Sequence, residues 1–123
     1  MDTTMMGRLI ALLFLGREVT HREHLRTKSY AQHVALNTFY DEIIDLADKF
    51  AEAYQGRHGL IGPIAVPAAK KTTNIIEFLQ AAMTEIEDSR YKVCEKTDTP
   101  IQNIIDEIVG LYLSTLYKLK FLA

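Results

Sequence analysis

Side chains that could bind a metal ion recur along one segment in the first half of the chain. On a helical wheel they form a single strip with spacings of three and four residues, made up of His33, Asn37, Asp41, Asp45, Asp48 and Glu52. Two further imidazoles, His21 and His24, lie one helical turn apart just before it. Acids on one helix face repel one another unless a cation or a partner surface neutralises them. Imidazole with carboxylate suits iron, zinc or manganese, and the simpler alternative is a solvated helix surface.

Helices must position these side chains, because four segments show helical periodicity and none alternates convincingly as a strand does. The first helix is expected at about residues 4–26. The second helix is expected to start at Ser29 with Gln32 and to stop at Gly56. The third is expected to start near Asn74, and the fourth at Thr99 as a cap followed by Pro100 and Gln102. Their buried faces are expected at Leu36, Phe39, Ile43, Ala47, Phe50 and Tyr54; at Ile75, Leu79, Ala82, Met83 and Ile86; and at Ile101, Ile104, Ile105, Ile108, Tyr112, Leu116 and Leu119.

The connections predict the topology. Short links join the first helix to the second and the third to the fourth, which favours two antiparallel hairpins. The segment 56–69 holds three glycines and two prolines, and its extended length is enough to run back along the bundle. We therefore expect an all-α, ferritin-like four-helix bundle with one long crossover between helices two and three, filling residues 1–123 as a single domain. Four apolar residues of the crossover, Leu60, Ile61, Ile64 and Val66, are expected to pack on the bundle.

The spacing of the strip resembles a known iron site. His21, His33, Asn37, Asp48 and Glu52 are separated by eleven, three, ten and three residues, and the ferroxidase motif of the Dps mini-ferritins has His, His, Asp, Asp and Glu at the same intervals. The similarity covers roughly residues 20–56. The chain departs from the motif at Asn37, which removes one anionic ligand, and His24 is an alternative to His21 as the first imidazole.

The mini-ferritin resemblance implies a function and an assembly. Family members form hollow twelve-subunit shells in which each iron site is shared across a two-fold interface. By resemblance, Asp48 and Glu52 would bind iron, and His33 with His21 or His24 would complete the site from the partner subunit. The implied activity is oxidation of Fe2+ to Fe3+ and storage of the mineral, with iron or another divalent metal as the bound ion. The implied partner is a second copy, in contact through helices one and two.

A second resemblance points to small uncharacterised proteins of tailed phages. It rests on His21-Arg22-Glu23-His24, on Thr27-Lys28-Ser29-Tyr30-Ala31 and on Tyr54-Gln55-Gly56. It favours an alternative function, a phage accessory or structural protein that keeps the fold and the oligomer interface without ferroxidase activity. A third reading is a helical module whose acidic strip docks on a basic partner. Whether the chain is an enzyme therefore stays open at this point.

Composition narrows the class of protein. The chain has 123 residues, a formal charge of −2 and one cysteine, Cys94. A near-neutral charge argues against a general DNA binder, and a single cysteine suits a reducing compartment. The apolar run at residues 9–15 is far too short to cross a bilayer. We expect a cytoplasmic protein, in the host cytoplasm if a phage encodes it, with neither DNA nor membrane as a partner.

Overall fold

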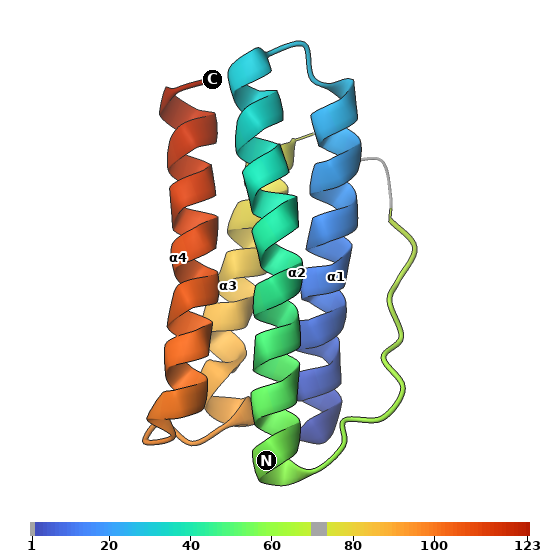
Figure 1. Cartoon of the computed structure of the whole chain (residues 1–123), viewed down its shortest axis with the longest axis vertical. Helices are drawn as coiled ribbons and strands as arrows, with labels where there is room; N and C mark the ends of the chain where they lie inside the picture. The colour runs from blue at the N-terminus through green and yellow to red at the C-terminus, as the bar shows by residue number, and fades with distance from the viewer. Residues whose placement is uncertain (1, 70–73) are drawn as a thin grey trace.

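The computed structural model describes residues 2–69 and 74–123, and four helices make up the regular structure of these residues. They are α1 (Thr3–Arg26), α2 (Tyr30–His58), α3 (Ile75–Val93) and α4 (Thr99–Phe121) (Figure 1). The described residues contain no strand. The predicted all-α class is therefore confirmed.

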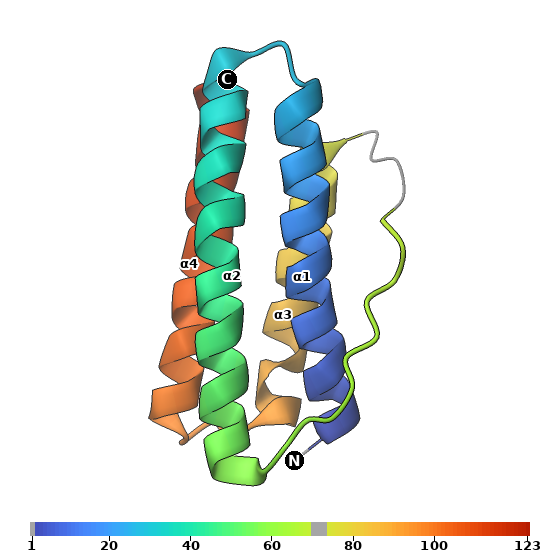
Figure 2. The ribbon, with the colours of Figure 1, turned by 45° about the vertical axis from the view of Figure 1, so that its right-hand side comes forward.

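The helices pack as a bundle with the connectivity that the sequence predicted. α1 and α4 run in one direction, and α2 and α3 run in the other (Figure 1). Each helix contacts two neighbours: α1 packs on α2 and α3, and α4 packs on the same two helices. After α2, residues 59–69 run along the outside of α1, as both views show (Figures 1 and 2). A single long crossover thus joins two antiparallel hairpins.

The buried faces of the helices are the predicted ones. All the core positions expected on α2, α3 and α4 are buried in one continuous cluster. From α1 the cluster takes Met6, Leu9, Ile10, Leu13 and Val19. Burial of aliphatic and aromatic side chains at helical spacing is the main force that holds such a bundle together.

Two helix starts follow their predicted caps. The Ser29 hydroxyl accepts a hydrogen bond from the Gln32 backbone N–H at 3.2 Å, and the Asn74 side chain accepts one from Glu77 N–H at 3.1 Å. The expected reciprocal contact from the Gln32 side chain is not the one formed, because its amide oxygen accepts from the Thr27 hydroxyl instead. These caps satisfy backbone donors that the first turn of a helix leaves free.

The predicted stop of α2 and the predicted cap of α4 are wrong, whereas Pro100 does lie in the first turn of α4 as expected. α2 continues through Gly56 and ends at His58, and Gly59 follows with a φ of 94°, a conformation that suits glycine. α4 has Asp98 as its N-cap residue and no side-chain cap hydrogen bond, so Thr99 does not serve as the cap. Gln102 also does not reach back. Its side chain is buried, and its Nε2 donates to the backbone carbonyl of Arg90 at 3.1 Å.

The crossover packs on the bundle at only some of the expected positions. Ile61 and Ile64 lie against the core, whereas Leu60 and Val66 are exposed. The Gln55 side chain accepts a hydrogen bond from the Ile61 backbone N–H at 3.1 Å, which ties the start of the crossover to the end of α2. None of the helices among the described residues is long and apolar enough to span a membrane.

Candidate functional site

The α1–α2 hairpin is closed by a reciprocal pair of histidine hydrogen bonds. His24 Nδ1 lies 2.8 Å from the backbone carbonyl oxygen of His33, and His33 Nδ1 lies 2.8 Å from that of His24. The two rings are stacked, with centroids 3.6 Å apart. Because a carbonyl oxygen can only accept, each Nδ1 must carry a proton and donate it. This arrangement leaves Nε2 of each ring outside the pair.

His21 and Asn37, the other two predicted ligands near the hairpin turn, lie in the same cluster as His24 and His33. The ring of His21 is stacked on that of Tyr40 at 4.2 Å. The Tyr40 hydroxyl donates to Asn37 Oδ1 at 2.6 Å, and Asn37 Nδ2 donates to Asp41 at 3.2 Å. His21, His24, His33 and Asn37 therefore gather at one end of the bundle, and both polar atoms of the Asn37 amide are engaged within the chain.

Tyr40 is a part of this cluster that the sequence reasoning missed. Its ring contacts His21 and also His24, whose centroid lies 5.2 Å away. It is one helical turn beyond Asn37, so its spacing could have placed it on the same side of α2. Tyrosines on helices usually pack at the contacts between helices. Because that explanation applies to every tyrosine of the chain, it did not identify Tyr40 as part of the cluster.

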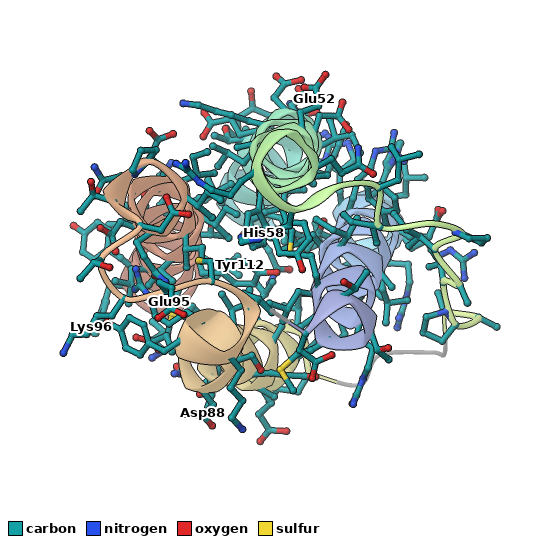
Figure 3. The ribbon with its side chains drawn as sticks, turned by 90° about the horizontal axis from the view of Figure 1, so that it is seen from below. Glu52, His58, Asp88, Glu95, Lys96 and Tyr112 are labelled. Carbon is teal, nitrogen blue, oxygen red and sulfur yellow. The ribbon has the colours of Figure 1, made fainter. Side chains whose placement is uncertain are left out.

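Asp48 and Glu52 do not join the imidazoles within one chain. They follow His33 on the same helix by 15 and 19 residues, a separation of roughly 22–28 Å at the rise of an α-helix. Both are exposed, and Glu52 points away from the centre of the bundle on the outer side of α2 (Figure 3). No group of three His, Cys, Asp or Glu side chains that could hold a metal occurs within residues 2–69 and 74–123. A site that used all the predicted residues would need a second copy.

The outer face of α2 is acidic and lacks compensating cations. Within the described part of the chain, Asp45, Asp48 and Glu52 form no ion pair. Lys49 lies among them in the sequence, but its ammonium group points to Glu107 of α4 at 3.4 Å. The face therefore presents carboxylates to whatever approaches it, as the wheel predicted.

A groove that the sequence did not signal lies beside α1. It has a volume of about 550 Å3 and is formed by α1, α2 and the crossover. Phe14, Ile44 and Val66 supply apolar walls, and the charged side chains along it are Arg17, Glu18 and Arg22. Glu18 and Arg22 pair with each other at 3.7 Å. None of the predicted ligands lines the groove, so it is separate from the imidazole cluster.

Comparison with known proteins gives a family and one relative. The model described as "Family of unknown function (DUF5856)" matches residues 24–119. The chain is 32% identical over 112 residues to a protein of Enterobacteria phage T4 named "Uncharacterized 14.6 kDa protein in mobD-ri intergenic region". That match covers 90% of this chain and 84% of the relative. No solved structure matches. Neither match is to a ferritin, so the comparisons support the phage resemblance and add nothing to the mini-ferritin one.

Proposed function

The chain belongs to the DUF5856 family of unknown function, and we propose that it is a phage-encoded protein that binds ferrous iron between two copies of itself. One observation carries the proposal. His33 and the carboxylates that form no described ion pair lie at separate levels of α2, with His24 of α1 paired to His33 and the carboxylates on an acidic outer face. Neither group alone is a site for iron, and an antiparallel partner would bring the two groups together.

The hydrogen bonds of the imidazoles suit metal binding. Histidines that bind metals usually donate the proton of the other ring nitrogen to a carbonyl or carboxylate, which sets the tautomer and the ring orientation. His24 and His33 each donate Nδ1–H to a backbone carbonyl. Their Nε2 atoms are then the lone-pair donors that could bind Fe2+. His21 has no hydrogen bond within the described residues and is the third imidazole in reach of the same end.

Helix geometry gives the register of the proposed dimer. If α2 packs antiparallel on α2 of a second copy, His33 and Asn37 lie opposite Glu52 and Asp48 of the other chain when the two-fold axis passes near residues 42–43. Asp41 and Asp45 then lie close to the same residues of the second copy. Their mutual repulsion favours a dimer that forms only when cations are bound.

The chemistry at such a site would begin with iron as the substrate. The carboxylates and imidazoles would hold Fe2+. Two Fe2+ ions would each give one electron to one oxidant molecule, so that with two protons dioxygen becomes hydrogen peroxide, or hydrogen peroxide becomes two waters, and both irons become Fe3+. Asn37 supplies a neutral amide in place of an anionic ligand, which weakens binding of a hard cation. We therefore propose binding of iron as the main function, and oxidation and storage of iron as a function that depends on it. The proposal puts the protein in the host cytoplasm, in a homo-oligomer of up to twelve subunits.

A second candidate function is a phage accessory protein that keeps the bundle and its interface without iron chemistry. The contacts of Asn37 favour it, because Tyr40 and Asp41 occupy both ends of the amide. The hydrogen bonds between His24 and His33 also account for both imidazoles as a structural lock on the hairpin. Under this function the acidic face would bind a basic protein surface.

An anaerobic Fe2+ titration with a parallel measurement of mass tests the proposal. We expect saturable binding with dimerisation, both lost in Asp48→Asn/Glu52→Gln. The matched control is Glu87→Gln/Asp88→Asn, which removes the same charge from two exposed acids on α3 and should bind like the unaltered protein. Subsequent admission of oxygen tests oxidation separately. A dimer that forms without iron and does not bind Fe2+ would overturn the proposal in favour of the accessory function. Equal loss of Fe2+ binding in both variants would show that the binding comes only from nonspecific attraction to negative charge.

A further inference from the structure

Exposed apolar side chains gather at one end of the bundle. Leu25 and Tyr30, on either side of the α1–α2 turn, are 73% and 81% exposed, and Phe121 near the end of α4 is 74% exposed. The turn and the C-terminus lie beside each other at this end (Figures 1 and 2). Val34, Tyr117 and Leu122 are also exposed on the neighbouring turns. We call these six residues the apolar tip. Large apolar patches on a protein surface usually mark a contact with another molecule.

Three lysines lie in the same segments as the apolar tip. Lys28 lies in the α1–α2 turn, and Lys118 and Lys120 lie in the last turn of α4. None of these three lysines has an acidic partner within the part of the chain that the structure describes. This end is therefore basic and apolar, whereas the outer face of α2 is acidic. The formal net charge of −2 does not reveal this separation of charge.

We propose that the apolar tip docks on the surface of an anionic phospholipid bilayer. Protruding aromatic and aliphatic side chains enter the headgroup region, and lysines beside them bind the anionic lipids. The tip is made by the α1–α2 turn and the last turns of α4, and a bilayer can accept exposed apolar side chains without a preformed groove. A second copy docked tip to tip would bring like charges together.

The proposal concerns contact with a membrane surface, and no part of the chain needs to cross the bilayer. The sequence-based expectation of no membrane partner rested on the short apolar run at residues 9–15, which bears only on spanning. Leu25, Tyr30 and Phe121 come from segments about 90 residues apart in the sequence. No local pattern could have joined them, and the fold brings them to one end.

Vesicle flotation of the full chain in EDTA tests this docking independently of the iron site. We expect binding to vesicles of phosphatidylcholine with 30% phosphatidylserine, chosen as an ordinary anionic mixture at roughly physiological surface potential, and little binding to phosphatidylcholine alone. Tyr30→Ser/Phe121→Ser should lower the partition coefficient by about tenfold or more. Leu60→Ser is the control, because Leu60 is 84% exposed and follows the C-terminal end of α2, whereas the apolar tip lies at the N-terminal end of that helix.

Three outcomes would overturn the proposal. The first is no flotation of the unaltered protein with anionic vesicles. The second is equal binding to neutral vesicles, which would remove the role of the lysines. The third is a loss in Leu60→Ser as large as that in the double variant, since that would indicate general adhesion. Circular dichroism of each variant establishes that a loss of flotation does not come from unfolding.

Discussion

His24 and His33 each donate a hydrogen bond from Nδ1 to the backbone carbonyl of the other residue, both at 2.8 Å. The pair joins the last turn of α1 to the first turn of α2, where only three residues separate the helices. It explains why two imidazoles lie face to face in the hairpin. It also fixes which ring nitrogen would remain for a ligand.

Removal of either member of the histidine pair should destabilise the hairpin. His24→Ala and His33→Ala are each expected to lower the free energy of unfolding by about 1–2 kcal/mol, since a partner carbonyl loses its donor. Because both bonds belong to one stacked pair, the double variant should lose less than the sum. Urea denaturation measures this. His21→Ala, which removes ring contacts with Tyr40 and His24 but no hydrogen bond of the pair, is the control, and strict additivity would contradict the coupling.

Asn37→Asp should move stability and iron affinity in opposite directions. The new carboxylate would lose the hydrogen bond to Asp41 and repel it, which should lower the free energy of unfolding by about 1 kcal/mol without metal. It would also add an anionic ligand, so Fe2+ should bind more tightly. Asn103→Asp adds the same charge at an exposed position of α4. If that control improved iron binding equally, Asn37 would not be part of the site.

Gly16 and Tyr112 are coupled by close approach in the core. A Cβ at Gly16 would lie 3.3 Å from the Tyr112 hydroxyl, and that buried hydroxyl has no hydrogen-bond partner in the described structure. Gly16→Ala should therefore be destabilising, and Tyr112→Phe should be neutral or stabilising by about 1 kcal/mol. In the Tyr112→Phe background, Gly16→Ala should instead be stabilising, because alanine favours the helix.

Another glycine supplies the control for that cycle. Gly110 lies in α4 with no described neighbour within 4 Å of an added Cβ, so this glycine does not mark a close contact between helices. Gly110→Ala should raise the free energy of unfolding by about 0.5–1 kcal/mol in either background. Thermal and urea denaturation measure all of these variants. If Gly16→Ala cost as much in the Tyr112→Phe protein as in the unaltered one, the predicted coupling would be wrong.

The thiol of Cys94 should make stability fall in alkaline solution. Burial, with a smaller effect of Asp98, raises its pKa from 9.0 to about 11. Between these values the unfolded chain releases the proton and the folded chain keeps it, so the free energy of unfolding decreases as pH rises from 9 towards 11. This group contributes a slope of at most about 1.4 kcal/mol per pH unit. Cys94→Ala should show a shallower slope, and an identical one would contradict the assignment.

The helices and their buried faces could be predicted from the sequence alone. Positions such as Phe39, Ile86 and Ile108 were predictable because apolar spacing of three and four residues reflects a local geometry that tertiary contacts only reinforce. The caps at Ser29 and Asn74 were predictable for the same reason. The place of Pro100 in the first turn of α4 was predictable as well. The role of Gln102 was not, because its side chain turns inward and donates to carbonyls at the end of α3, outside its own helix.

The candidate site was likewise predictable only where its residues are placed by local helix geometry. Spacing alone placed His33, Asp48 and Glu52 on one strip of a helix, and the rise of that helix keeps the acids far from the imidazole. The arrangement of the imidazole rings depends instead on the packing of α1 against α2, which pairs His24 with His33 and stacks His21 on Tyr40. The fold also brings the chain end to the hairpin turn (Figure 1). Those contacts join residues on different helices, and packing between helices is what selects them.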